Sequence, residues 1–270
     1  MLLTSVIIVL REVLEAALLL SILLATSRFM QLRTRWFYAS LAFGVVGAVA
    51  YGNNLTAISN AFDGTGQELL DAFLQFAIYL LLLLIVPLMV INHHRGAYKR
   101  NLLQGAMLVA VAFAVLREGS EVYVYLSAFR TQPDLYSSVM TGALLGAGIG
   151  FSIGALFYYL LLGLSRHYTL LLAGILLTLV GAGMCAQAAQ MLIQADWLPA
   201  QAPLWDTSAL LPEGSLPGQL LYALVSYEAT PTPIEVIVYS VSISLMVLLL
   251  GFTHYVSRSY RQNLPEARAH

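Results

Sequence analysis

Seven stretches of this chain are apolar over about 20 residues, the length that an α-helix needs to cross the hydrocarbon core of a bilayer. Backbone N–H and C=O groups find no water in lipid, so each stretch must satisfy them internally as a helix. None shows the alternating pattern of a membrane β-barrel strand. The sequence therefore predicts an all-α integral membrane protein with seven transmembrane helices, at residues 2–26, 36–53, 69–91, 102–128, 138–163, 169–194 and 234–256.

The composition supports a membrane location. Of the 270 residues 59% are hydrophobic and only 10% are charged, whereas soluble domains average about 25% charged residues. The net charge is -1 and the basic residues lie in short connections, which excludes nucleic acid as an expected partner. The first apolar stretch lacks a preceding Lys or Arg, so we interpret it as a helix and not as a cleavable signal. We expect a multi-pass protein of the plasma membrane, the inner membrane in a bacterium, surrounded by lipid.

The basic residues predict the orientation. Lys and Arg concentrate in cytoplasmic connections. With seven helices, Arg130 alone lies on one side, and ten basic residues lie on the other: Arg28, Arg33, Arg35, Arg95, Lys99, Arg100, Arg166, Arg258, Arg261 and Arg268. We therefore expect the N-terminus outside, an external loop at 195–233, and a cytoplasmic tail at 257–270. Within the loop, Ser215 and Pro217 predict the start of a short helix that ends near Tyr227.

The motif Arg-Glu-x-x-Glu occurs twice inside these apolar stretches. It spans Arg11 to Glu15 in the first predicted helix and Arg117 to Glu121 in the fourth. A charged residue near the bilayer centre costs roughly 2.5 to 3.5 kcal/mol on insertion-derived scales. These charges must therefore pair with one another, take up water or bind a cation.

The two motifs suggest an internal duplication. Positions 11 and 117 differ by 106, and the first predicted helix runs inward while the fourth runs outward. Residues 1–91 and 102–194 would then form a three-plus-three inverted repeat, with the seventh helix added, in a single permease domain of residues 1–270. Transporters with such repeats bind their substrate near the membrane midplane, where the repeats meet. We expect the two motifs to meet there.

The spacing of the motif residues predicts a cation site. The two glutamates of each motif are three residues apart and share one helix face, while each arginine can pair with the glutamate four residues away. Two arginines cannot neutralise four glutamates, which argues against salt bridges that only lock the helices together. Ligation by carboxylate oxygens suits a hard cation. The candidate metal ligands are Glu12, Glu15, Glu118 and Glu121, supported by Arg11 and Arg117.

With these motifs the chain resembles the oxidase-dependent iron permeases, the high-affinity iron transporters of fungi and bacteria. They carry Arg-Glu-x-x-Glu in their first and fourth transmembrane helices. The likeness covers nearly the whole chain and includes Gln67 to Ala72, Ala182 to Gln187 with Trp197, and Tyr227 to Tyr239. The chain departs from the family pattern at Val13, where Gly is usual, at Ser120, where Leu is usual, at Asp71, where Glu is common, and at Ser226, where Gly is common.

The resemblance implies the function. We expect a bacterial-type permease that imports iron in the ferric state through the four glutamates, with iron as substrate and no permanently bound cofactor. It implies an external iron-binding, oxidase or peroxidase partner that presents the metal. The resemblance also makes Glu68 and Asp71 a possible entrance, although an acidic helix start favoured by the helix dipole gives the same pattern.

Two alternatives remain at this level. The same architecture could import another cation, such as manganese or lead. An intramembrane sensor or enzyme could use the glutamates for proton chemistry, but the chain contains no His-Glu-x-x-His motif and only residues 257–270 follow the last predicted helix. We expect a transporter and not an enzyme.

Two further patterns concern helix packing. Glycines recur every four residues in the fifth predicted helix, which is typical of close contact between helices. Glutamines form a polar stripe on the sixth, which favours hydrogen bonds between helices. The residues are Gly142, Gly146, Gly150 and Gly154, and Gln187, Gln190 and Gln194.

Overall fold

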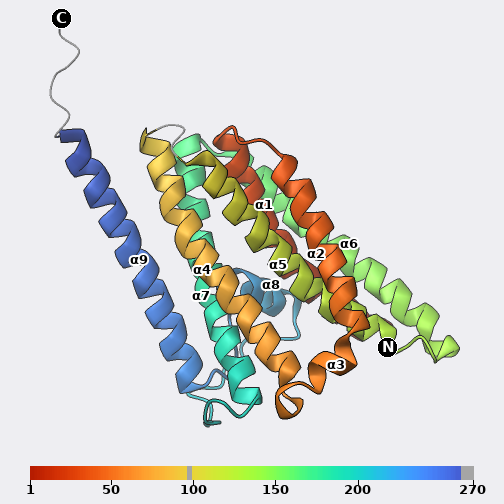
Figure 1. The fold of residues 1–270 in the computed structure, drawn as a ribbon. Coiled ribbons are helices and arrows are strands. Elements are labelled where there is room, and N and C mark those ends of the chain that lie inside the picture. Colours follow the sequence, from red (N-terminus) through yellow and green to blue (C-terminus); the bar gives the residue numbers. More distant parts are fainter. Residues whose placement is uncertain (96–98, 263–270) are drawn as a thin grey trace, which may run out of the picture.

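The computed structural model describes residues 1–95 and 99–262, and every regular element within them is helical (Figure 1). Each of the seven predicted stretches forms one helix, a little longer than predicted because the ends continue past the apolar residues. The all-α prediction is confirmed. The elements are α1 (Leu2–Phe29), α2 (Arg35–Asn53), α3 (Leu55–Ser59), a 3-10 turn (Phe62–Gly64), α4 (Gly66–Arg95), α5 (Arg100–Ser127), α6 (Pro133–Gly163), α7 (Arg166–Gln194), α8 (Leu216–Val225) and α9 (Pro233–Gln262).

Five helices are long and apolar enough to cross a membrane: α4, α5, α6, α7 and α9. These five identify a multi-pass membrane protein. The other two long helices fall short for visible reasons. Arg11, Glu12 and Glu15 interrupt α1, while α2 has only 19 residues and begins at Arg35. Length and composition therefore support five of the seven predicted spans.

The long helices pack mainly in pairs. Helix α1 lies along α6, α5 lies along α2, and α4 lies along α7, while α1 and α5 also contact each other. Helix α9 packs against α7 and α4 at the edge of the bundle (Figure 1). The largest apolar cluster fills the half of the bundle away from the N-terminus, with fully buried Ile22, Leu82, Met107 and Leu177 from four helices.

Glycines allow the two motif helices to approach their partners closely. A Cβ atom at Gly146 of α6 would lie 2.5 Å from the carbonyl oxygen of Val6 in α1, and one at Gly44 of α2 would lie 2.6 Å from Cβ of Val115 in α5. The other three glycines of the α6 row also face α1, so the predicted close packing is confirmed. Both motif helices are thus held against a neighbour through small residues.

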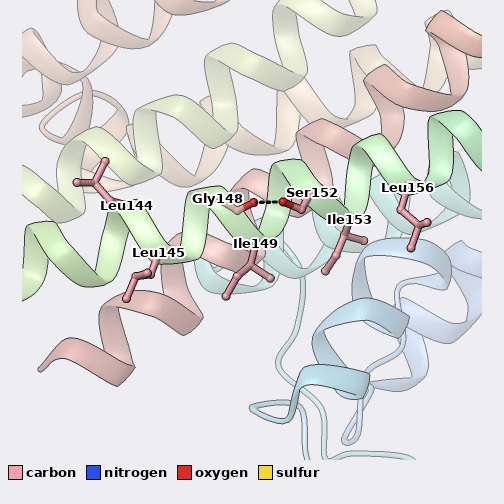
Figure 2. A pocket seen from close by; sticks show the side chains of 7 residues that line it. All are labelled: Leu144, Leu145, Gly148, Ile149, Ser152, Ile153 and Leu156. Atoms are coloured by element: carbon pink, nitrogen blue, oxygen red, sulfur yellow. Dashed lines mark hydrogen bonds between the residues drawn. The ribbon is translucent and has the colours of Figure 1, made fainter.

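The opposite face of α6 is exposed and apolar. A surface hollow of about 510 Å³ lies along this face. Figure 2 shows the residues that line it: Leu144, Leu145, Gly148, Ile149, Ser152, Ile153 and Leu156. The one hydroxyl in it, Ser152 Oγ, donates a hydrogen bond to the carbonyl oxygen of Gly148 at 2.7 Å. No motif residue lines this hollow. An apolar surface with its polar group satisfied within the helix suits contact with lipid.

Helix α8 forms at the predicted place in the 195–233 loop and packs against the bundle. The hydroxyl of Ser215 caps it by accepting a hydrogen bond from the backbone N–H of Gly218 at 3.2 Å. The helix contacts α1 and α7, and Figure 1 shows it at mid-height of the bundle. Its Ala223 is buried in a small apolar cluster with Leu14 and Leu18 of α1. The 195–233 loop therefore places α8 beside α1 at the height of the first Arg-Glu-x-x-Glu motif.

The end of α8 fits tightly against α7. Ser226 follows the helix with a left-handed backbone at φ 53°, a conformation that favours glycine. A Cβ atom at Gly183 of α7 would lie 1.5 Å from Oγ of Ser226. Gly183 therefore has to lack a side chain for α8 to end here.

The last predicted segment, the tail at 257–270, is only partly described. Helix α9 continues through Gln262, so the first six tail positions, 257–262, are helical. Residues 263–270 lie outside the described residues. Helix α9 is accordingly longer than the predicted span at 234–256.

Candidate metal-binding site between the motif helices

Three motif carboxylates meet between α1 and α5. One oxygen from each of Glu12, Glu15 and Glu118 lies within 4.8 Å of the other two. The three residues are only 6%, 3% and 2% exposed. Glu12 and Glu15 reach the same place because they share a face of α1, and α5 crosses that face at Glu118. Buried carboxylates at this separation repel one another unless positive charge lies among them.

Arg117 supplies part of that charge and connects the two helices. It is 3% exposed. Its Nη1 atom contacts the carboxylates of Glu118 and, at 3.4 Å, Glu15 across the helix interface. Its Nη2 atom lies 3.0 Å from Glu121, which confirms the pairing predicted from the four-residue spacing. One guanidinium thus holds three glutamates from both motifs.

Arg11 has different surroundings, although it occupies the same place in its motif. Its Nε atom lies 3.5 Å from Oε1 of Glu15, as the spacing predicts, but its side chain is 38% exposed. The guanidinium carbon lies 3.9 Å from the ring centroid of Tyr222 in α8. Among the described carboxylates, Arg11 therefore makes an ion pair only with Glu15, at the edge of the site.

Each buried carboxylate has one oxygen that accepts no hydrogen bond within the described part of the chain, although that of Glu15 forms the 3.5 Å ion pair with Arg11. Oε2 of Glu12, Oε1 of Glu15 and Oε2 of Glu118 are buried and accept no hydrogen bond from the described residues. Buried polar atoms normally have a partner. Four motif glutamates and two motif arginines also leave a formal charge of 2 − 4 = −2. Oxygen donors with excess negative charge can bind a hard cation.

Glu121 lies at the edge of this group and lines a cavity of about 360 Å³. Its side chain is 33% exposed, and it is not among the three glutamates that converge. The predicted entrance residues, Glu68 and Asp71, line the same cavity, as does Glu12. The cavity joins the start of α4 to the buried carboxylates, with further walls from Ile8, Gln67, Val124, Tyr125, Met191 and Gln194.

A chain of amides supports Glu15 from the other side. Gln187 of α7 donates from Nε2 to Oε2 of Glu15 at 3.4 Å, and Gln75 of α4 donates from Nε2 to Oε1 of Gln187 at 2.7 Å. Gln187 thus makes the predicted bond between helices, whereas Gln190 bonds Glu228 in the loop before α9 and Gln194 lines the cavity. Sequence reasoning missed Gln75, although a single amide within the apolar stretch at 69–91 was a usable signal. It also missed Tyr222, which no pattern distinguished.

A second set of acidic residues, Glu213, Glu228 and Glu235, fixes the 195–233 loop next to the site. Their carboxylates do not meet at one point. Oε1 of Glu228 accepts a hydrogen bond from Nε2 of Gln190 at 2.8 Å. Glu213 and Glu235 each accept one from a backbone N–H, of Ala229 and of Thr232, both at 2.6 Å. Burial, followed by the nearby charge of Glu235, raises the pKa of Glu228 to about 7. These carboxylates stabilise the loop that carries α8.

Comparison with known proteins identifies the family. The model of the Iron permease FTR1 family matches residues 2–262. The chain is 30% identical over 263 residues to the ferrous iron permease EfeU of Yersinia pestis, with 91% of both chains covered. It is 28% identical over 249 residues to the ferrous iron permease EfeU of Escherichia coli O6:K15:H31, covering 86% of this chain and 89% of that protein. No solved structure matches. The resemblance seen in the sequence is confirmed, and the chain belongs to the Iron permease FTR1 family, a family of membrane transporters and not of enzymes.

Proposed function

We propose that this protein imports iron through the buried carboxylates of Glu12, Glu15 and Glu118, with Glu121 at their edge. One observation carries the proposal: each of the three buried glutamates has an oxygen without a hydrogen-bond partner, and these residues converge between the two motif helices. Membership of an iron permease family supports iron as the substrate.

The cavity supports an entry route from one end of the bundle. Glu68 and Asp71 would receive the cation first, and Glu121 and Glu12 line the same cavity further in. Beyond the site, the bundle is filled by the large apolar cluster that includes Ile22. The site is therefore accessible from the cavity and closed toward the other end, so release to the far side needs a rearrangement of the helices.

We propose ferric iron as the transported state. The converging donors are all carboxylate oxygens, which suit the harder ion. The relatives compared above carry the name ferrous iron permease. Carboxylates also accept ferrous iron and manganese, so the two oxidation states have to be compared directly. We further propose that an external iron-binding, oxidase or peroxidase protein delivers the metal at the Glu68 end, as the family resemblance implies.

Uptake of radioactive iron into proteoliposomes tests this function. We expect accumulation that depends on the protein and that is faster with citrate-bound ferric iron than with ascorbate-reduced ferrous iron. Manganese or lead in about tenfold excess over iron should compete weakly, because of their lower charge or larger size. Faster ferrous uptake would refute the proposed oxidation state, and accumulation no faster than in protein-free vesicles would refute iron transport.

We also propose that α1 and α2 cross the membrane, which gives seven spans in an inverted repeat of α1, α2 and α4 with α5, α6 and α7. The packing supports this proposal. Exchanging the two repeats converts the contact of α1 with α6 into that of α5 with α2, and leaves the contacts of α4 with α7 and of α1 with α5 unchanged. All seven helices and α8 would form one domain in the plasma membrane, the inner membrane in a bacterium.

A fusion experiment tests the orientation. With the N-terminus outside and seven spans, alkaline phosphatase fused after His270 should be inactive in bacterial cells, because this enzyme requires the periplasm. The matched control is the same fusion at Ala202 in the proposed external loop, which should be active. The reverse activities would contradict the proposed orientation, and equal activities at the two positions would contradict a membrane crossing by α9.

A further inference from the structure

Tyr222 of α8 contacts the edge of the carboxylate site through Arg11. We propose that Tyr222 is a positioning residue: its ring limits Arg11 to one long contact with Glu15 and so keeps the carboxylate oxygens available to the cation. The inference rests on the proposed function, because it concerns the same site. It assigns a role in transport to α8, which belongs to neither motif helix.

The unequal contacts of the two motif arginines carry the inference. Arg117 places both terminal nitrogens against three carboxylates. Arg11 contacts Glu15 only, through Nε and at 3.5 Å, while its guanidinium lies over the Tyr222 ring. The motif alone does not produce this difference, since both arginines precede their glutamates by the same number of residues. The neighbour that distinguishes Arg11 is α8.

The ring can restrain Arg11 because α8 is itself fixed. Ala223, the next residue, is buried against α1. The hydroxyl of Tyr239 in α9 donates to the carbonyl oxygen of Val225 at 2.8 Å, and Ser226 fits against Gly183 of α7. A cation over an aromatic face is attracted by the electrons of the ring. The guanidinium therefore has a stable position beside the site.

Loss of the ring would release a competing charge. Glu15 Oε1 is the carboxylate oxygen that already faces Arg11, and it accepts no hydrogen bond. The Arg11 side chain is partly exposed, and its Nε atom already lies 3.5 Å from this oxygen. A guanidinium paired fully with Glu15 would occupy a ligand atom and neutralise part of the negative charge that attracts iron. More iron would then be needed to fill the site.

A double-mutant cycle tests this inference. Initial rates of iron uptake into proteoliposomes, normalised to inserted protein, give KM and the maximal rate for each variant. We expect Tyr222→Leu to raise KM about fivefold, the size of one cation–π contact. Tyr222→Phe, which keeps the ring, should leave KM unchanged. An Arg11→Gln background has no guanidinium that can move toward Glu15, so adding Tyr222→Leu should not raise the KM of Arg11→Gln further.

The alternatives give different results. A purely structural role for Tyr222 predicts the same loss in both backgrounds, with less inserted protein or a lower maximal rate and an unchanged KM. That result, an inactive Arg11→Gln protein, or a Tyr222→Phe protein that behaves like Tyr222→Leu would overturn the inference. Tyr222→Met replaces the Leu variant if the latter inserts poorly. Normal uptake by Glu118→Gln would instead refute the carboxylate site itself, whatever the Tyr222 variants show.

Discussion

Replacing Glu118 by Gln is expected to lower iron uptake per inserted molecule by about a hundredfold or more, since changes even to residues behind metal ligands cost 10- to 100-fold. Gln keeps the shape of Glu but lacks the negative charge and offers a single weaker oxygen donor. Glu118 is 2% exposed and one of its oxygens has no hydrogen-bond partner, so water cannot easily replace the lost ligand. Uptake of radioactive iron into proteoliposomes, normalised to inserted protein, measures the effect.

For the other motif glutamates, the loss of uptake should depend on whether the carboxylate converges with the others. Glu12→Gln and Glu15→Gln should be about as severe as Glu118→Gln, because the three carboxylates converge. Glu121→Gln should have a smaller effect, since that side chain lies partly exposed at the cavity. Glu213→Gln is the matched control: it removes a carboxylate outside the site and keeps an oxygen that can accept the Ala229 N–H.

A different result is expected if the motif residues only join the helices. Glu118→Gln would then leave Arg117 with fewer anionic partners and would lower the amount of inserted protein. Uptake per remaining molecule would stay normal. Western blots of the membrane fraction beside the transport rates separate these cases. Normal rates per molecule in the Glu12, Glu15 and Glu118 variants would exclude these carboxylates as ligands of the transported ion.

Much of the helical framework could be predicted because it follows from local rules. Apolar length fixed the seven helices, and four-residue spacing fixed the ion pairs of Arg11 with Glu15 and of Arg117 with Glu121. The position of α8 within the loop followed from Ser215 and Pro217. Each of these features depends on residues that are close in the sequence.

The contacts that distinguish one motif from the other could not be predicted in this way. Arg117 reaches Glu15 on another helix, and Arg11 lies over Tyr222, because of how α5 and α8 pack against α1. Periodicity gives the face of a helix that a residue occupies and does not give the neighbour on that face. The same limit applies to Gln75, whose partner Gln187 lies 112 residues away.

Replacing Arg117 by Lys is expected to lower iron uptake more than tenfold and to destabilise the protein, whereas Arg11→Lys should change uptake by less than about threefold. Arg117 joins three carboxylates through two nitrogens, and an ammonium cannot reproduce this planar two-point hold. Breaking a buried ion pair by removing a partner costs about 3 to 5 kcal/mol, and a lysine that reaches only one carboxylate would lose part of that energy.

Arg11 is the matched control for Arg117 because it occupies the equivalent motif position. Its guanidinium makes one long contact to a carboxylate and lies over the Tyr222 ring, where a lysine ammonium can also be attracted. Uptake rates and the temperature at which the detergent-solubilised protein loses its monodisperse gel-filtration peak measure the two effects. Equal losses in both Lys variants would contradict the asymmetry, because they would show that Arg11 holds its carboxylates as firmly as Arg117 does.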